Sequence, residues 1–416
     1  MINICYEQQI GDFFVPNGMP PEIVGEMKRL KNPKYVFAMG CVQEDTNLEL
    51  PVTVPHHYKN FLELYGIDYS EFVFGAKDVD FYYYVVAPYG SYQGFIGLFS
   101  EYQEQEENTG QMISNFAELI PEEIKNDLRI GKCKLLIDGL SEGHSFSVEW
   151  IERLHHLIDL ASIPRNTIHY LTSNIKYESD YHSEFKESNN LININSVDYF
   201  ELLIWEVYDK YFRYEVDYIR KRNKHFMSLN RAERRHRTDL VDFLIDTKLI
   251  ERGFVSYSLK ELYLDTNFVD VEHLESESHD LMEDISGEEY YRDSYFNIVT
   301  ETHFYENSLF LSEKIYKPII YKQPFLVYSS PFSMKRLRTI GYKTFSSIID
   351  ESYDLEVDNN KRRKMIELEI ERLCNLPLDE LHNLYVSIKD ILEYNFEYFI
   401  NKLDRGIDEN IFRICK

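Results

Sequence analysis

The sequence is poor in cysteine, and its few cysteines form no recognisable pairing pattern. There are five, at positions 5, 41, 133, 374 and 415, with no CxxC pair among them. An odd, scattered set favours free thiols in a reducing compartment over a disulfide framework, and it supports no structural zinc. We therefore expect a cytoplasmic protein.

Long apolar runs are also missing. The N-terminal stretch MINICYEQQIGDFF lacks a basic segment followed by an apolar one, which is the pattern of a secretory signal. No uncharged apolar run approaches the ~18 residues of a membrane-spanning helix. The sequence thus predicts no membrane span.

Positive charge is scarce. Lysine and arginine number 45 against 71 aspartates and glutamates, for a formal net charge of -26. Binding to nucleic acid or to anionic lipid needs a cationic face, because it releases counterions from the polyanion. The overall charge therefore disfavours nucleic acid as a partner, although a local basic patch could still bind one phosphorylated ligand.

Aromatic residues are plentiful, whereas glycine is not. The chain has 33 tyrosines and 27 phenylalanines but only 17 glycines in 416 residues, and 44% of its residues are hydrophobic. That supply is enough for two cores, and the length favours two domains. We expect the first domain over residues 1–205, the second over 206–377, and further helices over 378–416.

Strand and helix patterns alternate in both halves. Strand patterns occur at 132–138, 166–174, 225–229, 253–259, 295–301 and 324–328, and helical spacing occurs at 148–160, 195–222, 333–340 and again from about 361. Strand-helix-strand order favours parallel sheets. We therefore predict an α/β fold with two domains, and a cleft between them as the natural ligand site.

A basic segment is present in this acidic chain. Residues 220–237 contain eight arginines and lysines and one acid, Glu233. Within the segment, NRAERRHR (230–237) follows a predicted strand and precedes a helix, where guanidinium and backbone N–H groups suit a diphosphate. The alternative is a solvated turn, or a bridge to the stretch 261–293, which holds 12 acids and is expected to be a solvated insertion.

The stretch LSEKIYKPII (311–320) has the same placement, after a strand and at the start of a helix. Ser312 is the expected N-cap, and Glu313 and Lys314 then fall in the first turn. A glutamate there suits the helix dipole, but a lysine opposes it. The lysine therefore indicates that an anion lies nearby, although ordinary surface residues are the alternative.

These motifs resemble a known family. The order of strand, SEK, helix and PF strand is similar to the nucleotide-sugar-binding motif of α1,3-fucosyltransferases and of related GT-B glycosyltransferase-like proteins. A virus-associated subgroup has SEKxxKPIxxxQPF, then SLKxLRxxGFKTF and IDESYD. This chain has SEKIYKPIIYKQPF, SMKRLRTIGYKTF (333–345) and IDESYD (349–354). The resemblance covers about 225–355, the half that would bind the donor.

The resemblance implies a GT-B fold, in which two Rossmann-like domains face each other across a cleft and the C-terminal helices pack back toward the first domain. It implies that Lys314 contacts the diphosphate of a nucleotide-sugar donor and that Glu313 contacts the ribose. Arg231, Arg234 or Arg235 would hold the second phosphate. Lysine and arginine at two helix N-termini would neutralise the leaving diphosphate without a metal or other cofactor.

Two features leave alternatives open. Pro318 either delays the helix to about Lys317 or kinks it, and the Lys317 side chain could reach the donor or only the solvent. The segment SSPFS (329–333) stands where relatives often carry a glycine-rich turn. Ser329 and Ser330 either offer hydroxyls to the nucleotide or do not touch it.

Sugar transfer also needs a base that takes the proton from the incoming hydroxyl. The loop DGLSEGHS (138–145) lies at the carboxyl end of the clearest N-terminal strand. It offers Glu142, Asp138 and His144 as candidates, with Glu142 first, and its two glycines, Gly139 and Gly143, would let the backbone approach a ligand. The alternative is that Asp138 caps the next helix and that His144 is an ordinary surface residue.

Other motifs indicate no metal site. The sequence DVD (78–80) precedes a predicted strand, whereas the metal-binding DxD of GT-A glycosyltransferases normally follows one. Adjacent histidines such as His155 and His156 point in different directions on a helix and lack ligand spacing. We therefore expect no metal.

The expected function is a metal-independent glycosyltransferase that moves a sugar from a nucleotide-diphosphate sugar to a hydroxyl acceptor, with a glycan as the expected class. Inversion at the anomeric carbon is implied by the resemblance to fucosyltransferases. One alternative keeps the chemistry and modifies hydroxymethylated bases of viral DNA. The other is a non-catalytic nucleotide- or glycan-binding protein of the same fold.

Overall fold

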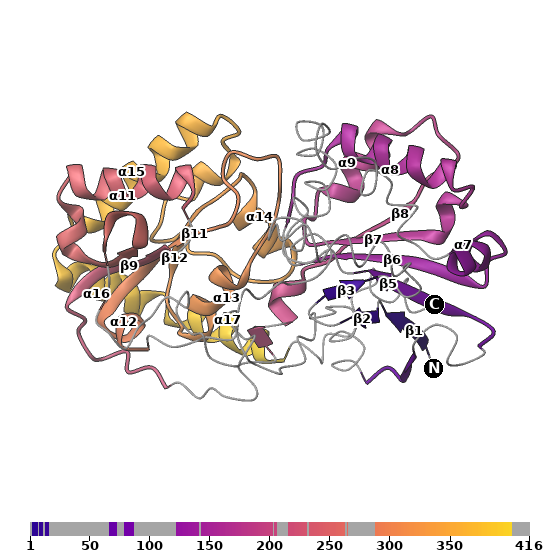
Figure 1. Cartoon of the computed structure of the whole chain (residues 1–416). Coiled ribbons are helices and arrows are strands. Elements are labelled where there is room, and N and C mark those ends of the chain that lie inside the picture. The colour runs from indigo at the N-terminus through magenta and orange to yellow at the C-terminus, as the bar shows by residue number, and fades with distance from the viewer. Residues whose placement is uncertain are drawn as a thin grey trace. The chain divides into compact units, whose positions relative to one another are not determined.

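The structure is a computed structural model of the chain. It describes residues 2–6, 8–10, 13–15, 66–72, 79–86, 122–140, 143–202, 204–205, 215–230, 233–262, 264 and 288–401. Two compact units are present, the first ending at Val197 and the second beginning at Asp198 (Figure 1). Residues 198–205 lie in the second of these units.

A parallel sheet forms the first unit. Its strands are β1 (Ile2–Tyr6), β4 (Tyr69–Phe72), β5 (Tyr82–Val86), β6 (Cys133–Gly139), β7 (Ile168–Thr172) and β8 (Asn193–Ser196). Their order is β4-β1-β5-β6-β7-β8, with every pairing parallel, and a separate antiparallel hairpin joins β2 (Gln8–Ile10) to β3 (Phe13–Val15). The helices are α7 (Glu122–Arg129), α8 (Val148–Leu160) and α9 (Tyr177–Glu184), with a short turn η1 (Arg165–Thr167). The strand, helix and strand predicted between 132 and 174 are confirmed.

The central strand of this unit shows why it forms. Leu135, Leu136 and Ile137 of β6 are fully buried, as expected of a parallel strand covered on both faces. At the end of β6, a Cβ on Gly139 would lie 2.9 Å from the carbonyl oxygen of Leu171 and from the ring of Tyr170. Packing between neighbouring strands is therefore one reason for a glycine at this position.

Four parallel strands form the sheet of the second unit. They are β9 (Lys224–Asn230), β10 (Gly253–Tyr257), β11 (Ser294–Thr300) and β12 (Phe325–Tyr328). The order is β10-β9-β11-β12. All seven residues of β11 are buried, so this strand is covered on both faces. All four strands were predicted, and the α/β class with parallel sheets is confirmed.

Helices cover both faces of this second sheet. They are α11 (Arg235–Asp246), α12 (Glu288–Asp293), α13 (Glu313–Ile320), α14 (Ser333–Thr339), α15 (Asn359–Cys374), α16 (Leu378–Ser387) and α17 (Lys389–Ile400), with short turns η2 (Leu249–Arg252), η3 (Ser258–Lys260) and η4 (Ser352–Leu355). Figure 1 shows α11 and α15 along one side of the sheet and α12, α16 and α17 along the other.

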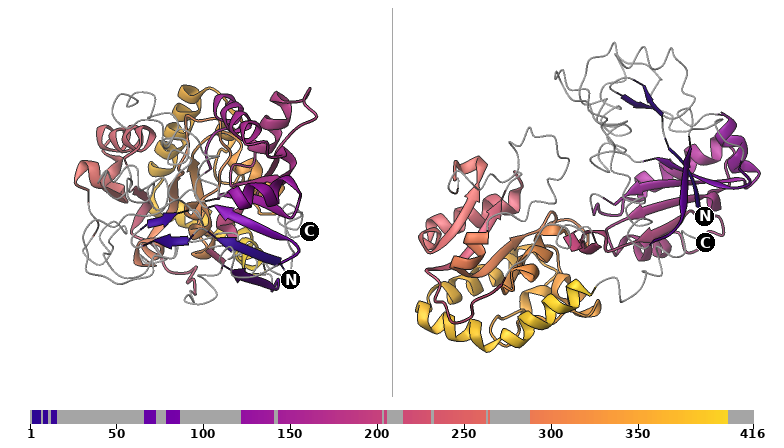
Figure 2. Two further views of the ribbon diagram at one scale, coloured as in Figure 1. Left: turned by 45° about the vertical axis from the view of Figure 1, so that its right-hand side comes forward. Right: turned by 90° about the horizontal axis from the view of Figure 1, so that it is seen from below.

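The C-terminal helices belong to the second unit. Helix α16 packs on β9 and β11, and α17 packs on α13. In the right-hand view of Figure 2 these yellow helices lie against the orange elements of the same unit. The chain from 402 onward lies outside the described residues, so its expected return to the first domain stays a prediction. In the part of the chain described, no helix combines the length and apolar character needed to cross a bilayer.

The helix predicted over 195–222 is wrong in its last part. The sequence predicts helix over 195–222, but residues 215–222 have irregular backbone. The guanidinium of Arg222 is buried here and donates to the carbonyl of Tyr291 at 2.7 Å and to the hydroxyl of Tyr385 at 2.5 Å. Contacts to segments distant in the sequence thus override a local helical pattern.

Candidate functional site

The candidate site lies where the chain changes direction in the second sheet. From β9 the chain moves outward to β10, and it then returns to β11 on the other side of β9 and continues to β12. Ligands of open parallel sheets bind outside the carboxyl ends of the strands at such a switch point. The neighbouring strand ends are Asn230 of β9 and Thr300 of β11, whose side chains share a 2.7 Å hydrogen bond.

Helix α13 starts at the predicted place, after the loop 301–312 that follows β11. Ser312 is its N-cap, with an extended backbone, and the Ser312 hydroxyl accepts a hydrogen bond from the backbone N–H of Lys314 at 3.3 Å. The helix runs through Pro318, so it does not start near Lys317. The capped first turn therefore contains both Glu313 and Lys314.

Glu313 and Lys314 form an ion pair with each other, and their side chains are 16% and 29% exposed. Lys317 lies one turn further along, on the same side of the helix as Glu313. Burial raises the pKa of Glu313, but the charges of Lys314 and Lys317 outweigh it and hold that pKa at about 2. The first two turns of α13 therefore have one carboxylate, Glu313, and two ammonium groups, Lys314 and Lys317.

A fully buried carboxylate lies behind the N-cap. Glu301, directly after β11, accepts the backbone N–H of Ser312 at 3.1 Å on Oε1 and the Ser312 hydroxyl at 2.5 Å on Oε2. Burial raises the pKa of Glu301, whereas Lys314 and Ser312 act in the opposite direction. Glu301 was not among the residues predicted for the site. The only signal was an acid that follows a buried strand and precedes SEK.

The arginine-rich loop after β9 is only partly described. Arg231 lies outside the described residues. Arg234 is the N-cap of α11, its backbone is extended and its own side chain makes no capping hydrogen bond. Its Nε is buried without a hydrogen-bond partner in the described part of the chain. Arg235 is exposed, and its guanidinium lies 5.0 Å from the centre of the Tyr305 ring.

Arg237, which was not among the predicted residues, hydrogen-bonds the end of β11 at the switch point. Its side chain is 3% exposed, and its Nη2 lies 3.4 Å from the carbonyl oxygen of Thr300. The neighbouring His236 donates from Nε2 to the carbonyl of Glu301 at 2.9 Å. The first turn of α11 is thus hydrogen-bonded to the end of β11. Glu301, at that same strand end, hydrogen-bonds Ser312, the N-cap of α13.

The other basic residues of 220–237 lie at the opposite end of β9. Arg220 pairs with Asp293, and Lys221 pairs with Asp379 at 2.6 Å. Both precede β9, whereas NRAERRHR follows it, so the length of the strand separates the two groups by roughly 20 Å. The segment is therefore not one basic surface, which removes the support it would have lent to nucleic-acid binding.

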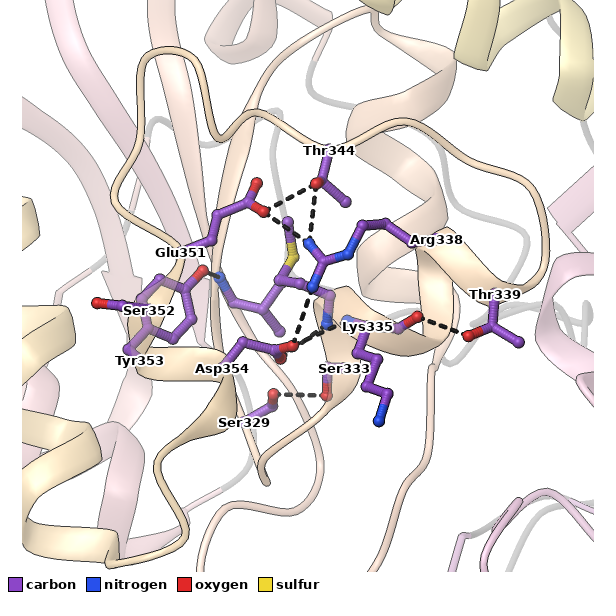
Figure 3. A network of polar contacts seen from close by, with 12 residues as sticks. Ser329, Ser333, Lys335, Arg338, Thr339, Thr344, Glu351, Ser352, Tyr353 and Asp354 are labelled. Atoms are coloured by element: carbon purple, nitrogen blue, oxygen red, sulfur yellow. Dashed lines mark hydrogen bonds and ion pairs between the residues drawn. The ribbon is translucent and has the colours of Figure 1, made fainter.

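The IDESYD motif caps a third helix (Figure 3). Asp354 accepts the backbone N–H groups of Met334 and Lys335 at 2.8 Å each, and its carboxylate lies 3.7 Å from Arg338. Arg338 also donates to Glu351 at 2.8 Å. A protein carboxylate therefore occupies the N-terminus of α14, and this helix start is not open to phosphate.

The serines of the SSPFS segment are used within the protein. The hydroxyl of Ser329 lies 2.8 Å from that of Ser333, and the hydroxyl of Ser330 donates to the carbonyl of Glu306 at 3.1 Å. Both Ser329 and Ser330 are buried. Of the two alternatives, the structure favours the one in which these hydroxyls do not contact a nucleotide.

Of the three candidate bases in the first unit, only the side chain of His144 is described. Glu142 lies outside them, and Asp138 is a residue of β6 whose side chain is not part of the description. His144 is half-buried, and its carbonyl accepts from the Asn174 amide at 2.8 Å. The choice of base therefore stays a prediction.

The histidine pair of α8 points in two directions, as predicted. His155 is buried, with Nε2 3.0 Å from the Tyr181 hydroxyl, whereas His156 is exposed. Over the described ranges, no group of three or more His, Cys, Asp or Glu residues could hold a metal ion.

The first turns of α13 and α11 therefore carry two cationic side chains, Lys314 and Arg237. Both helices follow strands that are neighbours in the sheet. No protein-family model and no curated protein matches the chain. The family resemblance accordingly rests on the motifs themselves.

Proposed function

We propose that the chain is a glycosyltransferase of the GT-B type, which moves a sugar from a nucleotide-diphosphate sugar to a hydroxyl acceptor, with a glycan as the expected acceptor. The second unit binds the donor, and the first carries the acceptor and the base. One observation supports this above all: Lys314 and Arg237 occupy the first turns of two helices that follow neighbouring parallel strands at the switch point.

The chemistry needs positive charge at that place. The acceptor oxygen attacks the anomeric carbon, the bond from that carbon to the diphosphate oxygen breaks, and the nucleoside diphosphate leaves with the electron pair. Preorganised cations and N–H groups stabilise this developing charge. Each charge-assisted contact contributes about 1.5–3 kcal/mol. The proton of the acceptor hydroxyl passes to a base of the first unit, for which Glu142, Asp138 and His144 remain the candidates.

The remaining polar groups of the first turn suit the rest of the donor. A carboxylate can accept hydrogen bonds from two hydroxyls at once, so Glu313 is assigned to the ribose. Lys317 shares the side of α13 on which Glu313 lies and adds to the positive charge.

Donor binding is tested by a thermal-shift panel of nucleoside diphosphates and nucleotide sugars. A ligand at a hundred times its Kd stabilises the folded chain by about 2.7 kcal/mol. Lys314→Ala is expected to abolish that shift. Lys364→Ala, which removes an exposed lysine of α15, is the matched control and should retain it. Unchanged affinity in Lys314→Ala would refute the site.

Turnover is tested separately, because the base belongs to the other unit. The donor that binds is incubated with a panel of glycan acceptors, and release of free nucleoside diphosphate is measured. Release that depends on the acceptor supports the transferase. Binding without release from any donor and acceptor would favour the non-catalytic alternative.

A further inference from the structure

The hydroxyl of Ser312 is contacted by three polar atoms. They are Oε2 of Glu301 at 2.5 Å, the backbone N of Lys314 at 3.3 Å and the Nζ of Lys314 at 3.3 Å. A backbone N–H and an ammonium group can only donate hydrogen bonds. The single hydrogen of the hydroxyl must therefore point to Glu301, and both of its lone pairs face Lys314.

Glu301 is constrained in the same way. Its Oε1 accepts the backbone N–H of Ser312 at 3.1 Å, which is again a group that can only donate. With Oε2 facing the hydroxyl hydrogen of Ser312, both carboxylate oxygens act as acceptors, which is the arrangement that the ionised side chain provides. Glu301 is completely buried, so bulk water does not compete for either oxygen.

We propose that Glu301 is a positioning residue of the donor site, which orients the Ser312 hydroxyl and thereby holds the ammonium of Lys314 over the first turn of α13. Its effect on the donor rests on the proposed function, since Lys314 is the residue assigned to the diphosphate. The hydrogen-bond arrangement itself does not depend on that assignment. Because Glu301 is buried behind Ser312, it acts through that residue and does not touch the ligand.

Glu301→Gln is the decisive variant because it keeps the shape and changes one acceptor into a donor. The amide oxygen of glutamine must take the Ser312 N–H, so the amide NH₂ faces the hydroxyl. The hydroxyl oxygen then meets three donors with two lone pairs, and a contact to Lys314 is lost. Ser312→Ala removes the same hydroxyl directly, so the two changes should have the same consequence for Lys314.

The first measurement needs no ligand. Lysine amines of the full chain are labelled with acetic anhydride, and the rate at Lys314 is compared with that at exposed Lys364 by peptide mass spectrometry. We expect labelling of Lys314 to accelerate several-fold in Glu301→Gln and in Ser312→Ala, with no further gain in the double variant. An unchanged rate in Glu301→Gln, or effects that multiply in the double variant, would overturn the proposal.

A second variant covers the case in which Glu301→Gln does not fold. Glu301→Asp keeps two acceptor oxygens, so it should leave Lys314 labelled more slowly than Ser312→Ala does. Equal rates in Glu301→Asp and Ser312→Ala would contradict the proposal.

The second measurement is the Kd of inorganic pyrophosphate and of the nucleoside diphosphate with the largest thermal shift. Glu301→Gln should weaken both about tenfold, and the double variant with Ser312→Ala should bind no more weakly than Ser312→Ala alone. If the unaltered chain binds neither probe, the proposed function fails, while the labelling result still decides the role of Glu301. Tight binding by Glu301→Gln would refute its effect on the donor.

Discussion

The ammonium of Lys314 is paired with the carboxylate of Glu313, its immediate neighbour in the chain. Both residues stand in the first turn of α13, and both are partly exposed. An anionic ligand at Lys314 must therefore compete with Glu313 for the same ammonium. Since the ribose is assigned to Glu313 and the diphosphate to Lys314, replacing Glu313 should affect the two parts of a nucleotide in opposite directions.

Glu313→Gln is expected to raise the affinity for inorganic pyrophosphate several-fold, because Lys314 is released from its partner. The same change should lower the affinity for a nucleoside diphosphate about tenfold, or by about 1.4 kcal/mol, because the ribose contact is lost. Isothermal titration with both ligands checks this. Glu380→Gln is the control, since it removes an exposed carboxylate from the first turn of α16. Parallel changes for the two ligands would argue against the ribose assignment.

Arg237 is expected to matter more than Arg235, although only Arg235 was predicted. Arg237→Gln should weaken nucleoside diphosphate binding at least about tenfold, since one charge-assisted contact contributes about 1.5–3 kcal/mol. Arg235→Gln removes a charge that faces the Tyr305 ring on the exposed side of the same helix, and it should change the Kd less than about twofold. Titration of both variants, with Arg237→Lys to retain the charge, makes the comparison.

The reverse order of effects would place the second phosphate at Arg235. Because Arg237 is buried, its variants also need a thermal melt, so that a weak Kd is not confused with loss of the fold.

The strands of both sheets could be predicted because their apolar runs are buried by neighbours on both sides. The segments 132–138 and 295–301 are of this kind, and each begins and ends within one residue of the observed strand. The cap at Ser312 was also predictable, since a serine before a turn of charged residues is a local signal. Local chemistry was therefore enough for the elements and for one half of the site.

The other half depends on contacts that the local sequence does not contain. Which arginine of NRAERRHR faces the sheet depends on where α11 begins, and its N-cap is Arg234, which is not a usual cap residue. The role of Glu301 appears only when the chain after β11 returns to place Ser312 against it. The IDESYD motif was taken as part of a ligand-binding resemblance, whereas Asp354 caps α14.

The Asp354 cap gives a prediction about stability rather than binding. Asp354→Ala should destabilise the second unit by about 2–3 kcal/mol, because two N–H groups lose a charged acceptor and Arg338 loses a buried neighbour. Urea denaturation measures the difference. Asp358→Ala, at the exposed N-cap of α15, is the matched change and should cost only about 1 kcal/mol.

The same variant should not change the affinity for a nucleotide, and this can be measured separately. Since Asp354 occupies the start of α14, phosphate is not expected to bind there, and folded Asp354→Ala should retain the Kd of the unaltered chain. A clear gain in affinity would mean that the emptied helix start can bind the ligand, and the site would have to be extended to α14.

His236 links the site to the acid stability of the second unit. Its ring is buried beside those of Phe304 and Tyr328, and burial, reinforced by the charge of Arg237, lowers its pKa from 6.5 to about 3. The folded state therefore binds fewer protons at this residue than the unfolded state does between those two values. The stability it provides is complete above pH 6.5 and is lost as the pH falls toward about 3.

His236→Gln keeps a donor for the carbonyl of Glu301 but removes this titration. At about pH 8 the variant should be the less stable protein, because it loses the stacked ring. As the pH falls below 6.5, the difference in unfolding free energy should shrink, by up to about 1.4 kcal/mol per pH unit. Urea denaturation at a series of pH values measures it. A difference that is constant with pH would show that His236 does not resist protonation in the folded chain.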